Sequence, residues 1–171
     1  MPVNIEIKAR CADLESVRAV LAEYGARRVG LDRQVDTYFA VADGRLKLRR
    51  GNIEQNLIYY RRPDGKAPKK SDVFLSPCDD PDSLGALLRE AFGVKCVVDK
   101  QREIYFHGNV KLHVDQVESL GSFVEIEVIE ESDIVDEEEM RLECLRWMDR
   151  LGISADDLVA VSYSDMLIVK S

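Results

Sequence analysis

The sequence predicts an α+β fold, in which about eight antiparallel strands close into a barrel and helices pack on its outside. Stretches that alternate apolar and polar residues with period two indicate the strands. Short turn signals join most of these stretches as hairpins, and three segments have the apolar spacing of helices. Eight strands are enough to close a barrel. Because no repeat or linker divides the 171 residues, we expect one domain spanning residues 1–171.

The first half of the chain alternates between strand and turn signals after an initial strand and helix. Residues 3–10 place apolar side chains on one face and polar side chains on the other, which is typical of a strand. Asp13 is a helix N-cap, and Gly25 ends that helix. Further strands are predicted at residues 34–40, 44–50, 55–62 and 72–76.

The second half contains two long helices and the remaining strands. Asp80-Pro81 begins a helix that Gly93 ends, and the acidic run of residues 130–139 begins a helix that Gly152 ends. Ser154 is expected to cap a short helix. Strands are predicted at residues 97–106, 110–117 and 122–129, and residues 161–169 are expected to form a last strand or a helix-to-strand transition.

Composition excludes several classes of protein. The net charge of −8 argues against nucleic-acid binding, which needs an electropositive surface. The four cysteines have no Cys-x-x-Cys spacing, so we expect reduced thiols and no zinc centre. No apolar run approaches the ~20 residues that span a bilayer, and the start lacks the features of a signal peptide. We therefore expect a cytoplasmic protein that binds no membrane.

Charges of both signs recur on the polar faces of the predicted strands. If the sheet closes with its helices outside, these faces line the interior, where charges are unfavourable unless paired with each other, a ligand or a metal. Lysine and arginine neutralise phosphate oxygens, and carboxylates bind Mg²⁺ or Mn²⁺, so such an interior fits a polyphosphate with divalent cations. The alternative is a solvated sheet face with scattered ion pairs. The principal charged positions are Glu6, Lys8, Lys47, Arg49, Arg61, Lys100, Arg102, Asp115, Glu125 and Glu127.

The segment Asn4-Ile5-Glu6-Ile7-Lys8 is similar to the Glu-x-Glu-x-Lys signature of the CYTH superfamily, the triphosphate tunnel metalloenzymes. The rest of the chain resembles family blocks in the family's order, most closely those of the class IV adenylate cyclase-like subgroup. These blocks are Gln34-x-Asp36-Thr37-Tyr38-Phe39, Leu46-Lys47-Leu48-Arg49, Tyr60-Arg61-x-Pro63, Lys100-x-Arg102, Asp115-x-Val117-x-x-Leu120-Gly121-x-Phe123-x-Glu125-Ile126-Glu127 and Ser162-Tyr163-x-Asp165.

The resemblance implies an eight-stranded antiparallel tunnel and a set of site residues. Glu6, Glu125 and Glu127 would be ligands of Mg²⁺ or Mn²⁺, and Asp115 would lie near the metal or orient a basic partner. Glu6, Lys8, Arg61 and Asp115 would form the catalytic set. The residues that would contact the triphosphate are Lys8, Lys47, Arg49, Arg61, Lys100 and Arg102.

Three functions stay open on this basis. The first is a class IV adenylate cyclase-like enzyme that converts ATP to cyclic AMP and pyrophosphate. The second is a triphosphatase acting on thiamine triphosphate or inorganic triphosphate, and the third is a noncatalytic triphosphate-binding or sensing module. Asn4 stands where the signature has its first glutamate, which reduces the negative charge available to a second metal ion. A homodimer is common among relatives.

Two further features have alternative readings. His113 is either a proton shuttle or a hydrogen-bonded residue of the tunnel wall. The lysines at positions 66, 69 and 70 belong either to a solvated loop or to a lid over bound phosphates.

Overall fold

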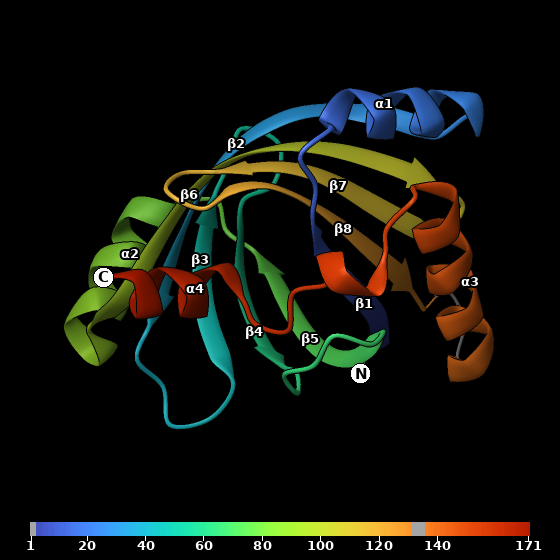
Figure 1. Ribbon diagram of the computed structural model, residues 1–171. Helices are drawn as coiled ribbons and strands as arrows, with labels where there is room; N and C mark the ends of the chain where they lie inside the picture. Colours follow the sequence, from blue (N-terminus) through green and yellow to red (C-terminus); the bar gives the residue numbers. More distant parts are fainter. Residues whose placement is uncertain (1–2, 131–135) are drawn as a thin grey trace.

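The computed structural model describes residues 3–130 and 136–171 (Figure 1). Within these residues eight strands form one antiparallel sheet that closes on itself, as the sequence predicts. Going around the ring, the order is β1-β5-β4-β3-β2-β6-β7-β8. The strands are β1 (Val3–Arg10), β2 (Arg27–Phe39), β3 (Arg45–Arg50), β4 (Asn56–Arg61), β5 (Lys69–Pro77), β6 (Val94–His107), β7 (Val110–Val117) and β8 (Gly121–Ile129).

Strand β1 closes the ring because it pairs antiparallel with two strands that lie far from it in sequence, one along each edge. One edge pairs with β5, placing Glu6 opposite Lys69, and the other pairs with β8, placing Glu6 opposite Glu127. Most other neighbours are consecutive hairpins, whereas β2 and β6 pair over a long register from Arg27 to Phe39. Side chains alternate along each strand, so one set of residues points into the barrel and the other points outward.

Side-chain caps fix where the helices begin. Asp13, Asp80 and Asp136 accept hydrogen bonds from backbone N–H groups in the first turns of α1 (Leu14–Glu23), α2 (Pro81–Phe92) and α3 (Glu137–Arg150). Ser154 precedes the short 3₁₀ helix η1 (Ala155–Asp157). Of residues 130–139, positions 131–135 lie outside the described residues, and the helix itself begins at Glu137.

Helices cover the apolar outer face of the sheet. The main core lies between α1, α3 and the outward side chains of β1, β7 and β8, and Trp147 and Cys144 are fully buried in it. A smaller cluster packs α2 against β2 and β3 through Leu88, Phe39 and Leu48. Figure 1 shows α1 and α3 lying outside the barrel on this face. The charged inner faces of the strands are thereby directed into the barrel.

The end of the chain differs from the sequence-based expectation. Residues 161–169, expected to contain a strand, instead form most of α4 (Tyr163–Lys170). The reason is a capping box, in which Ser162 Oγ and the carboxylate of Asp165 satisfy each other's backbone N–H groups. Among the described residues, no helix has the length and apolar character needed to cross a membrane.

Candidate active site

The barrel encloses a channel with a cavity of about 130 Å³. Charged side chains from five of the strands line it, together with Tyr38, Tyr60 and Tyr163. Among the predicted site residues, the cations that bind Asp36 (Lys47, Arg49 and Lys100) lie on one wall of the channel. The predicted glutamates lie on another wall. The predicted residues that line the cavity are Glu6, Lys8, Lys47, Arg49, Lys100, Arg102, Glu125 and Glu127.

The wall built by β2, β3 and β6 has more positive than negative charge. Asp36 is fully buried and accepts from three cations: Lys47 Nζ at 3.0 Å, Lys100 Nζ at 3.3 Å and Arg49 through two nitrogens at 2.9 Å. These cations hold the pKa of Asp36 well below its usual range, although burial alone would raise it. Burial lowers the pKa of Lys100 well below its usual value, with Arg102 adding to the effect. Three buried cations therefore share the carboxylate of Asp36, so this wall retains positive charge that an anion would neutralise.

Asp115 anchors the arginine at the centre of the channel. It accepts both Nε and Nη2 of Arg102, at 2.7 and 2.6 Å, and the hydroxyl of Tyr163 at 2.7 Å. Arg102 also reaches Glu125 Oε2 at 3.0 Å. Three hydrogen bonds, two of them from Arg102, thus hold the Asp115 carboxylate against this arginine.

The second wall, formed by β1 and β8, carries three glutamates. Glu6 and Glu127 face each other across the strand pair, and Glu125 faces Lys8. Lys8 Nζ lies 3.2 Å from Glu125, and its ammonium group lies over the ring of Tyr163 at 3.7 Å. Burial, together with the charges of Glu6 and Glu125, raises the pKa of Glu127. Its carboxylate accepts a hydrogen bond from Asn4 Nδ2, so Asn4 occupies the first signature position as a neutral donor.

These three glutamates suit a divalent cation in donor type and in strand position. In the described residues, no three His, Cys, Asp or Glu side chains are gathered as a metal site. Glu6 pairs with Arg62, and Glu125 pairs with Lys8 and Arg102. Mg²⁺ and Mn²⁺ take hard oxygen ligands, so the carboxylates of Glu6, Glu125 and Glu127 fit either ion in donor type.

Arg61 does not line the channel, although the resemblance implied that it would contact the triphosphate there. Strand β4 directs Ile58, Tyr60 and the following Arg62 into the channel, and therefore Arg61 points outward, where its Nε donates to Asp43 at 2.9 Å. The alternation was ambiguous because residues 57–60 are apolar or aromatic on both faces.

Arg62 takes the place inside the barrel that was assigned to Arg61. Its side chain is 6% exposed and pairs with Glu6. Two of its nitrogens, Nε and Nη2, are buried without a hydrogen-bond partner, as is the hydroxyl of Ser71 on the channel wall. Buried donors normally have partners, so these orphan groups indicate that the channel is built to receive a polar ligand.

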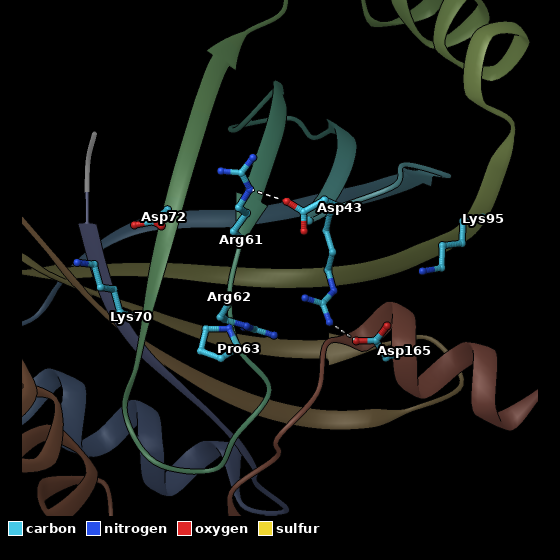
Figure 2. Close-up of a pocket in the computed structure, with 10 residues that line it drawn as sticks. Asp43, Arg61, Arg62, Pro63, Lys70, Asp72, Lys95 and Asp165 are labelled. Atoms are coloured by element: carbon cyan, nitrogen blue, oxygen red, sulfur yellow. Dashed lines mark hydrogen bonds and ion pairs between the residues drawn. The ribbon is translucent and has the colours of Figure 1, made fainter.

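A wider hollow of about 600 Å³ adjoins the channel at Arg62 (Figure 2). Figure 2 shows Arg61 and Asp43 paired at its edge, while Asp165 of α4 and Lys95 lie on the other side. Arg45, at the start of β3, closes part of the rim by donating to Asp165 at 2.7 Å. The hollow is open and is lined by both cations and carboxylates.

The structure also shows the contacts of His113 and of two lysines from the predicted lysine loop, Lys69 and Lys70. His113 faces the channel with Nδ1 3.4 Å from Glu125, and burial lowers its pKa to about 3. A neutral imidazole that donates to Glu125 favours the wall role over that of a proton shuttle. Lys69 and Lys70 belong to β5; Lys69 Nζ donates to the carbonyls of Gly65 and Ala160, each at 2.8 Å, and Lys70 pairs with Glu137.

The fold and the site together define a closed antiparallel barrel whose channel is lined by lysines, arginines and glutamates. The CYTH domain family matches residues 3–163, and this chain belongs to that family. CYTH family members include enzymes that act on triphosphates.

The individual relatives agree over almost the whole chain. A Methanocaldococcus jannaschii protein named "Putative adenylate cyclase MJ0240" is 26% identical over 176 residues, which covers 96% of this chain and 98% of that protein. The solved structure of PH1012 from Pyrococcus horikoshii has a TM-score of 0.83 at 27% identity, covering 95% and 98% of the two chains. HpAC1 from Hippeastrum shares the fold, with a TM-score of 0.63 at 14% identity over 99% and 95%.

Proposed function

We propose that this protein is a metal-dependent enzyme that binds a triphosphate in its channel and converts ATP to cyclic AMP and pyrophosphate. The observation that carries the proposal is the group of three buried cations, Lys47, Arg49 and Lys100, around the carboxylate of Asp36, in which Arg49 also pairs with Glu54. Three cations against two carboxylates leave positive charge inside the barrel, which is costly without a further anion, and a triphosphate supplies one. The M. jannaschii relative, whose name is "Putative adenylate cyclase MJ0240", supports the choice of reaction.

The residues divide the work of positioning and charge stabilisation. Of the predicted set, Lys8, Lys47, Lys100 and Arg102 would bind phosphate oxygens, whereas Arg49 is held by both Asp36 and Glu54. Arg62 would replace Arg61, using its two unpartnered nitrogens. Asp36 and Asp115 hold these cations in place before substrate arrives, so little reorganisation is needed as charge develops. Tyr163 fixes Asp115 from the side of α4.

Glu6, Glu125 and Glu127 would hold Mg²⁺ or Mn²⁺. When bound, such a cation neutralises charge on the phosphate oxygens and makes phosphorus easier to attack. The open hollow beside Arg62 offers space for the nucleoside, because the channel of about 130 Å³ is smaller than the ~300–1,000 Å³ of a usual ligand pocket. In the cyclase reaction the ribose 3′-hydroxyl attacks the α-phosphorus and pyrophosphate leaves.

A triphosphatase is the second candidate. HpAC1 of Hippeastrum, which has this fold, is described as a "Putative adenylyl cyclase" that has a dominant triphosphatase activity. Hydrolysis would use the same cations, with water as the attacking group at the terminal phosphorus. Binding without turnover, as in a sensor, is the remaining alternative.

The test is incubation with ATP, thiamine triphosphate and inorganic tripolyphosphate, each with Mg²⁺ or Mn²⁺, followed by separation of the products. Cyclic AMP with pyrophosphate supports the cyclase, orthophosphate supports the triphosphatase, and tight binding without products supports the sensor. The variant Glu125→Gln with Glu127→Gln should weaken metal binding in calorimetry. Unchanged metal affinity in this variant would refute the assigned site, and Glu103→Gln, which lies outside the barrel, is the matched control.

A further inference from the structure

The loop between β3 and β4 contributes Glu54 to the lining of the channel, and a buried carboxylate binds the backbone of this loop. Asp32 is fully buried and accepts the backbone N–H groups of Asn52, Ile53 and Glu54 at 2.7, 2.9 and 2.9 Å. It also accepts from Gln34 Nε2 at 2.8 Å. Four donors on one carboxylate make this an ordered loop.

Gly51 shows how closely the loop is packed. A Cβ at this position would lie 2.5 Å from the carbonyl oxygen of Glu54 and 2.6 Å from Asp32 Oδ1. Neither atom belongs to a long flexible side chain, so a larger residue would push the loop away from Asp32. The loop conformation therefore fixes where residue 54 enters the channel.

Glu54 extends from this loop into the channel and pairs with two cations. Its carboxylate lies 2.9 Å from Arg49 Nη1 and also pairs with Lys111 Nζ, and both cations line the cavity. The side chain is 18% exposed. Lys111 and Arg49 hold the pKa of Glu54 well below its usual range despite burial, so the carboxylate is ionised.

Glu54 lies at the opposite end of the β3–β4 hairpin from the open hollow. Arg45 and Tyr60 pair near the hollow, whereas Arg49 and Asn56 pair next to the loop. A polyphosphate that enters from the hollow reaches Arg62 first and meets Glu54 last. An acidic group at the end of the channel away from the hollow occupies the same cations that another phosphoryl group would need.

We propose that Glu54 is a specificity-determining residue that limits how many phosphoryl groups the channel accepts. It acts as a built-in anion on Arg49 and Lys111, so that a triphosphate fills the remaining cations and a fourth phosphoryl group is repelled. The inference rests on the proposed function, because it specifies the length of the substrate bound in that channel.

The experiment compares inorganic tripolyphosphate with tetrapolyphosphate by isothermal titration calorimetry at fixed Mg²⁺. The wild-type protein should bind tripolyphosphate at least tenfold more tightly than tetrapolyphosphate. In Glu54→Gln, which keeps the shape and removes the charge, this ratio should fall to about one. Glu54→Asp, which withdraws the carboxylate by one methylene, should give an intermediate ratio and serves if the glutamine variant does not fold. Glu103→Gln, a carboxylate that binds Arg18 on the outside of the barrel, should keep the wild-type ratio.

The outcomes separate this inference from the proposed function. An unchanged ratio in a folded Glu54 variant overturns the inference even if the wild-type enzyme turns over ATP. A shifted ratio without turnover of any triphosphate supports the inference and refutes the enzymatic proposal. If neither polyphosphate binds wild type or variant, both proposals are wrong.

Discussion

Replacing Asp36 by asparagine should destabilise the protein strongly and make it dependent on an anion. The carboxylate is fully buried and is the shared partner of Lys47, Arg49 and Lys100. Asparagine keeps the shape but removes the charge, and its amide group presents N–H donors to cations. Three buried cations would then lack their common counterion.

The magnitude follows from the burial. Removing one partner of a buried ion pair costs about 3–5 kcal/mol of unfolding free energy. With an unfolding entropy of about 2.1 cal/mol/K per residue, the 171-residue chain has a total of roughly 0.36 kcal/mol/K. The Asp36→Asn protein should therefore unfold about 8–14 °C below the wild type at pH 7.

The assay is thermal unfolding with and without tripolyphosphate. The anion should raise the midpoint of Asp36→Asn by more than it raises that of the wild type, since it replaces the lost charge. Glu103→Gln, which removes a carboxylate outside the barrel, should show no extra stabilisation by the anion. A midpoint of Asp36→Asn within about 2 °C of wild type, or equal anion effects on the two proteins, would refute the reasoning.

Three further outcomes are expected. Arg62→Met should weaken tripolyphosphate binding about 10–100-fold by calorimetry, as expected for loss of charged hydrogen bonds. Arg61→Met should leave the affinity nearly unchanged. Equal effects of the two variants would contradict the placement of Arg62 inside the barrel and Arg61 outside it. Asn4→Glu should tighten Mn²⁺ binding or raise activity, and no change in either would refute a limiting role for position 4. The pKa of His113 is about 3 in the folded protein and ~6.5 unfolded. The unfolded state therefore binds more protons between these values, so stability falls as pH drops from 7 to 5, by roughly 2 kcal/mol from this residue. His113→Asn should lose less stability over that range in denaturant titrations, and an equal loss would contradict the assignment.

The strand pattern predicted the closed barrel because alternation is decisive where one face is uniformly apolar. The strands carrying Glu6, Lys47 and Glu125 have that pattern, and their side chains lie in the channel as the alternation requires. Residues 57–60 are apolar or aromatic on both faces, so alternation cannot tell which face of this strand points into the barrel. For this reason the prediction named Arg61 and not Arg62.

Other parts of the site depend on contacts that periodicity does not encode. Glu54 lies in a loop, and its position is set by the hydrogen bonds of Asp32, which is distant in sequence. The last helix formed where a strand was expected because the Ser162–Asp165 capping box outweighs the β-branched residues of the segment. The alternation of residues 110–114 places Lys111 on the charged face of its strand. Its pairing with Glu54 depends on the folded loop, which the alternation does not encode.

The double pairing of β1 has a consequence for how the protein is made. Strand β1 must wait for β8, which ends at Ile129, before its second edge can be satisfied. Until then the nascent chain has an open sheet in which β1 pairs only with β5. Contacts so far apart in sequence form slowly. Glu6 and Glu127 meet at this seam, so the carboxylate wall forms only after β8 has left the ribosome.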